Sequence, residues 1–158
     1  MQYRYFLTLL YSEIILSFME KSILGYLQDL FVSDFSNEFL QEAFDQDENK
    51  CLAEVGDSIL DLVIRMIEYR KPDATPKSID NARQKYASKK ALQSVLNGDR
   101  EFTEYLIECH GCTSPPGHIG LERSDDYIEA IIGATFLIKG LKAACDFSKI
   151  LLNLDYNK

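Results

Sequence analysis

Two stretches of the sequence carry carboxylates at spacings that suit chemistry on a helix. In the first stretch, Glu54 and Asp57 lie three positions apart with Gly56 between them. In the second, Asp126 and Glu129 show the same spacing, and Gly133 follows one turn later. Residues three or four apart share a face of a helix, and carboxylate oxygens are the ligands that magnesium prefers. The residue types therefore point to a metal site.

Glu129 is the acid whose setting is hardest to explain by structure alone. It is the single charged residue between Tyr127 and Ile138. A helix that is apolar on nearly every side is buried, and an ionised carboxylate there needs a cation, a metal or several hydrogen bonds. A basic side chain such as Arg83 or Lys85 is the alternative partner to a metal.

Gly56 and Gly133 indicate how the two stretches meet. A glycine inside a helix costs about 1 kcal/mol relative to alanine, so it usually marks the close approach of another backbone. We therefore expect the two helices to touch at these turns and to bring Asp57, Asp126 and Glu129 together. Three acids at one point repel one another, and a divalent cation relieves that repulsion.

The first stretch also carries an apolar stripe and a charged stripe at helical spacing. We expect the apolar stripe to face the core; its residues are Leu52, Val55, Ile59, Leu62, Val63, Met66 and Ile67. The charged stripe comprises Glu54, Asp57, Asp61, Arg65 and Glu68. The alternative to a metal site is that this second stripe is an ordinary solvated face.

Periodicity favours helix along nearly the whole chain and predicts an all-α fold. We expect helices at residues 2–19, 21–32, 36–45, 50–70, 76–96, 99–109, 123–138 and 140–152. Thr75 is suited to cap a helix that has Pro76 in its first turn. The segment from Cys109 to Gly120 is expected to be a loop, because it holds a proline pair and three glycines. Residues 1–20 would form an extra amphipathic helix packed on a main domain at 21–158.

The composition limits the classes of partner and compartment. The 158 residues are about one domain in length, and the net charge of −8 argues against a general nucleic-acid-coating surface. Acids that hold metal ions also lower the net charge, and bound cations would reverse its local sign. The four cysteines fit reduced thiols of a cytoplasmic protein. The apolar segment from Phe6 to Met19 is interrupted and too short to span a bilayer, so we expect no membrane insertion.

The two acidic stretches resemble, in order, the two signatures of the ribonuclease III family. Leu52–Leu62 (LAEVGDSILDL) resembles the family's leucine, glycine-aspartate and aliphatic helix signature. Ser124–Ala134 (SDDYIEAIIGA), continued by Phe136-Leu137 and Gly140-Leu141, resembles its aspartate, glutamate-alanine and glycine-alanine pattern. Between them, Ala87–Leu92 (ASKKAL) is similar to the serine-containing helix that usually separates the two. The resemblance runs over about residues 38–152.

This resemblance implies a ribonuclease III-type endonuclease domain of about seven to eight helices. The matched acids Asp57, Asp126 and Glu129 would ligate Mg²⁺, for which Mn²⁺ can substitute, and a water would attack a phosphodiester of double-stranded or structured RNA. The products would carry a 5′ phosphate and a 3′ hydroxyl, and two metals could stabilise both reacting oxygens. Members of the family pair as two-fold homodimers. The alternative function is a catalytically weak or inactive scaffold in a ribonucleoprotein, as some members with degenerate sites are.

Two positions depart from the family pattern. Ala53 stands where the four-acid version of the family has a glutamate, although the stand-alone Mini-III branch, which lacks a double-stranded RNA-binding domain, also looks to have alanine there. Glu54 stands where the family usually has an aromatic or aliphatic residue that packs into the dimer partner. Because Glu54 lies on the Asp57 side of the helix, we expect it to be an additional metal ligand.

The loop before the second signature suggests two further possibilities. Cys109, Cys112 and His118, with Cys51 or Cys145 nearby, have ligand types that suit structural zinc, although their spacing is not that of a standard zinc finger. Without zinc, the loop and its neighbours would supply basic side chains for RNA phosphates. The candidates are Arg83, Lys85, Lys89, Lys90, His118 and Arg123, each of which has the alternative of being a solvated surface charge.

Overall fold

The computed structural model describes residues 22–31, 36–114, 116–117 and 120–153. The chain divides into two compact units, residues 1–35 and residues 36–158. The described part of the first unit contains helix α2 (Ile23–Leu30), whose N-cap hydroxyl at Ser22 accepts a hydrogen bond from the Gly25 amide. The helix expected at residues 2–19 lies outside the described residues, so its packing stays a prediction. None of the described helices is long and apolar enough to cross a membrane.

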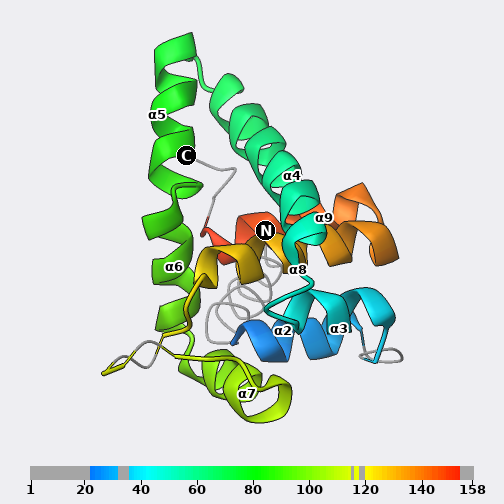
Figure 1. The fold of residues 1–158 in the computed structure, drawn as a ribbon. Coiled ribbons are helices and arrows are strands. Elements are labelled where there is room, and N and C mark those ends of the chain that lie inside the picture. The colour runs from blue at the N-terminus through cyan, green and yellow to red at the C-terminus, as the bar shows by residue number, and fades with distance from the viewer. Residues whose placement is uncertain (1–21, 32–35, 115, 118–119, 154–158) are drawn as a thin grey trace, which may run out of the picture. The chain divides into compact units, whose positions relative to one another are not determined.

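Helices α4 (Lys50–Tyr69) and α8 (Ser124–Lys139) carry the two acidic stretches and form the centre of the second unit. Helix α8 packs against α3 (Glu38–Phe44), α4, α6 (Lys89–Gly98) and α9 (Leu141–Leu151). Figure 1 shows α4 crossing over α8. From Tyr127 to Thr135 every residue of α8 except Glu129 is buried. The prediction that this apolar helix lies in the core is confirmed.

The two interior glycines hold α4 and α8 in contact. A Cβ atom added at Gly56 would overlap the backbone carbonyl of Glu129. A Cβ added at Gly133 would overlap the carbonyl oxygen of Leu52 on the opposite helix. Each glycine thus accommodates the backbone of the partner helix at the turn that carries an acid. The sequence-based prediction of close approach at these positions is confirmed.

The described residues contain helices and no strands, as the predicted all-α class requires. One predicted element is wrong: the helix expected at residues 76–96 is two helices, α5 (Pro76–Tyr86) and α6. The break occurs because Ser88 has extended backbone geometry and its hydroxyl accepts a hydrogen bond from the Ala91 amide, which begins a new helix. At the start of α5, Thr75 is the expected N-cap, with Pro76 in the first turn, and Ser78 within that turn completes a capping box with Thr75.

The buried face of α4 is rotated from the predicted apolar stripe. Leu52, Ile59 and Val63 are buried as expected, but Leu62 and Met66 are each 42% exposed. The contact at Gly56 explains this difference, because it turns the Leu52, Gly56 and Leu60 side of the helix toward α8. Apolar periodicity alone cannot find a glycine-centred face. The remaining helix, α7 (Arg100–His110), ends at Gly111 with left-handed backbone geometry.

We predict that Gly56→Ala destabilises the protein by about 3 kcal/mol or more, because the added methyl group must push apart two packed backbones. Gly98→Ala is the matched control, since a Cβ there meets nothing within 4 Å. That control is expected to change the free energy of unfolding by less than about 1 kcal/mol, in the stabilising direction. Chemical denaturation of both variants measures the two values. Equal stabilities would contradict the close contact.

Candidate active site

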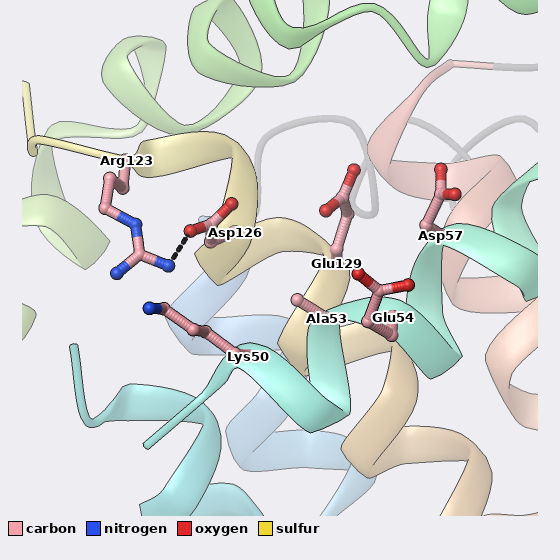
Figure 2. A pocket seen from close by; sticks show the side chains of 7 residues that line it. All are labelled: Lys50, Ala53, Glu54, Asp57, Arg123, Asp126 and Glu129. Carbon is pink, nitrogen blue, oxygen red and sulfur yellow. Dashed lines mark ion pairs between the residues drawn. The ribbon is translucent and has the colours of Figure 1, made fainter. Parts of the chain in front are cut away.

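The two acidic stretches line one pocket of about 450 Å³ between α4 and α8. Lys50, Ala53, Glu54 and Asp57 come from α4, at the 0, 3, 4 and 7 spacing of a single helix face. Arg123, Asp126 and Glu129 come from the start of α8 and the residue before it. Figure 2 shows the seven side chains, with Arg123, Lys50 and Asp126 toward one end and Glu54, Asp57 and Glu129 toward the other.

Glu129 is surrounded by other acids. Burial, and after it the negative charges of Asp57, Asp125, Asp126 and Glu54, together raise the pKa of Glu129 to about 8. Within the described residues no ion pair joins Glu129 to a basic side chain. Of the two basic partners considered from the sequence, Arg83 pairs instead with Asp61 at 2.9 Å, and the Lys85 ammonium lies 4.6 Å from the ring centre of Tyr86.

Asp126 is held differently, by an ion pair with Arg123 (Figure 2). Arg123 also donates from Nη1 to the backbone carbonyl of Gln46 at 3.2 Å. The lysine at the start of α4, Lys50, lines the same end of the pocket. Sequence reasoning did not select Lys50, although its helical spacing to Ala53, Glu54 and Asp57 would have revealed the shared face.

The rest of the charged stripe on α4 is paired with basic side chains, including Glu68, which is itself buried. Asp61 pairs with Arg65 at 2.6 Å as well as with Arg83, and Glu68 pairs with Lys71 at 2.5 Å. The stripe therefore divides into two parts. Its C-terminal part is neutralised by salt bridges of the usual kind, whereas Glu54 and Asp57 face the pocket without such pairs among the described residues.

The structure distributes the predicted phosphate-contacting residues over several places. Lys89 lies 3.4 Å from the carboxylate of Asp125, which also accepts a hydrogen bond from Gln93. This pairing draws α6 against the start of α8. Lys90 is exposed on α6, while His118 lies outside the described residues. Of the predicted basic residues that the structure describes, Arg123 is the one that lines the acidic pocket.

Of the two cysteines in the predicted zinc loop, Cys112 has a structural role. Cys112 is buried, accepts a hydrogen bond from the Tyr127 hydroxyl at 2.8 Å and donates to the Phe44 carbonyl at 3.4 Å. Burial also raises the pKa of the Cys112 thiol, which disfavours the thiolate that zinc binds. Cys109 is exposed, and the part of the zinc hypothesis that rests on His118 falls outside the described residues.

The residue types that line the pocket suit a hard cation, but their side chains are not arranged as a ligand set in this structure. Four carboxylates from two helices line it, and a half-buried acid with a raised pKa, Glu129, would be stabilised by a bound cation. Among the described residues, however, no three His, Cys, Asp or Glu side chains already form a ligand set. The Arg123 ion pair gives one physical reason, since it draws the Asp126 carboxylate to the basic end of the pocket.

We predict that Glu129→Gln stabilises the metal-free protein in a pH-dependent way. Below about pH 4.5 the carboxyl is protonated in both the folded and the unfolded chain, so the variant and wild type differ least. As pH rises toward about 8, the unfolded chain releases this proton while the folded chain retains it, and wild-type stability falls. Glutamine does not titrate, so the stability of the variant does not fall for this reason as pH rises.

The measurement is denaturation in a chelator at several pH values. Glu101→Gln serves as control, because Glu101 is exposed in the first turn of α7, away from the pocket. The stability gain of Glu129→Gln is expected to grow between pH 5 and pH 8, as the raised pKa of about 8 requires. A gain that is constant over this range would contradict the raised pKa.

Comparison with models of known protein families identifies the domain. Residues 50–140 match the Ribonuclease III domain family. No curated protein and no solved structure matches. The matched range holds both helices of the pocket and covers more than half of the chain. The ordered signatures, the all-helical fold and this match together show that the chain belongs to the ribonuclease III family.

Proposed function

We propose that this protein is a magnesium-dependent endoribonuclease that hydrolyses phosphodiester bonds in double-stranded or structured RNA. The products would carry a 5′ phosphate and a 3′ hydroxyl. Its membership of a family of double-stranded RNA endoribonucleases supports the substrate class. The observation that carries the proposal is Glu129, a half-buried carboxylate among other acids with no ion pair to it among the described residues.

The proposed roles follow from the positions of the side chains. Asp57 and Glu129 extend from the two helices that touch at Gly56, so a cation held between them would be fixed by the helix contact itself. Asp126, one turn before Glu129, would complete the set on release from Arg123. Glu54 is exposed at the pocket rim and would be an additional ligand. Bound Mg²⁺ would polarise the scissile phosphate and help a water to attack it.

The net charge of −8 is compatible with this function. Part of the negative charge is gathered in the pocket, where bound cations would reverse the local sign. Ala53 lies in the pocket at the position of the family's fourth acid, and no carboxylate replaces it there. The carboxylate of Glu54, at the next position in the sequence, would partly compensate for the negative charge that Ala53 lacks.

Cleavage tests the proposal directly. The purified chain with Mg²⁺ and a long RNA duplex is expected to yield fragments with 5′ phosphates, and Asp57→Asn is expected to reduce the rate by about 100-fold or more, because even supporting residues of metal sites often matter by 10- to 100-fold. Glu54→Ala tests the additional ligand and should raise the magnesium concentration at which cleavage is half-maximal, because a lost carboxylate weakens the binding of the cation. Gel analysis with end-group labelling measures rates and products.

Two results would contradict these assignments. If wild type and Asp57→Asn both fail to cleave, the alternative of a non-catalytic ribonucleoprotein scaffold is favoured. If Glu54→Ala shows the wild-type response to magnesium, Glu54 is not a ligand.

We further propose that the protein forms a homodimer through α4. Leu62, Met66 and Tyr69 on this helix are 42%, 42% and 76% exposed, so they form an apolar stripe beside the acidic face. Clustered exposed apolar residues usually mark an interface. Family members typically dimerise, and this supports a second copy of the chain as the partner.

Leu62→Asp tests the dimer, because a charge in an apolar interface is strongly disfavoured. Analytical ultracentrifugation is expected to show a dimer for wild type and a monomer for the variant at micromolar concentration. Leu141→Asp, at the exposed start of α9, is the control and should leave the dimer intact. A monomeric wild type, or a dimer that persists in Leu62→Asp, would exclude this interface.

A further inference from the structure

The acidic pocket has a basic end that the roles assigned above leave unused. Lys50 is the first residue of α4, and Arg123 immediately precedes α8. Both line the pocket that holds Glu129 and Asp126. These two basic side chains lie 73 positions apart in the sequence, so only the tertiary fold brings them together. Their position beside the acids, and not on a separate surface, needs an explanation.

We propose that Lys50 and Arg123 bind a phosphate group of the RNA, and that Arg123 exchanges Asp126 for this phosphate when a divalent cation enters the pocket. The inference deepens the proposed function and rests on it. Guanidinium groups bind phosphate through two parallel hydrogen bonds, and ammonium groups bind it as point charges. The pair therefore has the chemistry of a phosphate site.

Both the backbone conformation of Arg123 and the position of its charge are energetically unfavourable. Its φ angle is 55°, in the left-handed region that side-chain-bearing residues rarely adopt. It is also a cation at the N-terminus of a helix, where the helix dipole favours negative charge. Unfavourable backbone geometry of this kind gathers at functional sites. The side chain remains 31% exposed, so a ligand can reach it.

A network of hydrogen bonds fixes the direction of the Arg123 side chain. Its Nη1 donates to the backbone carbonyl of Gln46. The Gln46 side-chain oxygen in turn accepts from the Thr113 amide at 3.3 Å and from the Thr113 hydroxyl at 3.2 Å. One side of the guanidinium is thus anchored to protein through Nη1, while Nη2 pairs with Asp126. Because Nη1 stays bound to Gln46, Nη2 can exchange Asp126 for another partner while the side chain remains in the pocket.

Electrostatics favours that change of partner. A divalent cation near Asp57 and Glu129 attracts the Asp126 carboxylate and repels the guanidinium of Arg123. The cation and Arg123 therefore compete for Asp126, and an RNA phosphate arriving with the cation offers Arg123 a replacement. Lys50 is exposed and has no ion pair among the described residues, so it is available to the same phosphate.

RNA binding provides the first test. In an Asp57→Asn background that stops cleavage, and with Mn²⁺ at a concentration high enough to occupy the remaining ligands, the affinity for a short RNA duplex is measured by fluorescence anisotropy at several salt concentrations. Lys50→Gln and Arg123→Gln are each expected to weaken binding about 5- to 10-fold and to reduce the slope of log affinity against log salt by about 1. Lys77→Gln, a change of the same charge at an exposed residue in the first turn of α5, should alter neither quantity.

Metal binding provides a second test that needs no RNA and no activity. Calorimetric titration of Mn²⁺ is expected to show severalfold tighter binding for Arg123→Gln than for the wild-type chain, because Asp126 is released from its ion pair. Arg123→Lys keeps the charge but loses the two-pronged geometry, so its RNA affinity should fall between those of wild type and Arg123→Gln. Circular dichroism confirms that each variant is folded.

The outcomes separate this inference from the proposed function. Unchanged RNA affinity and salt slope in both Lys50→Gln and Arg123→Gln, with wild-type cleavage intact, would overturn the phosphate site alone. Unchanged or weaker Mn²⁺ binding in Arg123→Gln would overturn the exchange of partners. If wild type neither binds nor cleaves duplex RNA, the proposed function fails and this inference fails with it.

Discussion

The backbone contact between α4 and α8 is the interaction on which the rest of the structure depends. At Gly56 and Gly133 the two helices approach so closely that a methyl group on either glycine would overlap the opposite backbone. This contact fixes which side of α4 faces the core and leaves Leu62 and Met66 exposed. It also brings Asp57 and Glu129 into one pocket. The same two glycines thus determine the packing and the position of the acids.

The pocket is a balance between burial and charge. Glu129 lies on a helix that is otherwise buried around it, and the neighbouring acids make its ionised form still less favourable. Arg123 relieves part of this repulsion through Asp126, and a divalent cation would relieve the rest. A site with this balance would respond strongly to cations, because each positive charge that entered would stabilise several carboxylates. That property distinguishes the acids of the pocket from Asp61 and Glu68, which salt bridges already neutralise.

Local sequence patterns predicted most of the helices but not every boundary. The cap at Thr75 was predictable because its hydroxyl and the following proline act within one turn. The break at Ser88 was missed because serine inside a helical pattern gives no clear sign of whether it caps a new helix. The exposed face of α4 was also misassigned, since apolar periodicity overlooks a glycine that packs directly on a backbone.

By itself the sequence determined the all-helical class, the burial of α8 and the pairing of glycines with acids, because these depend on spacing within single helices. It did not identify Lys50, nor the ion pair that ties Arg123 to Asp126. Those depend on the crossing of two helices and on the backbone geometry at Arg123, which no periodicity records. Only the tertiary structure could decide that the acids of this pocket share it with two basic side chains, Lys50 and Arg123. The physical reason is that charge neutralisation at a site depends on the distances between segments that are far apart in the sequence.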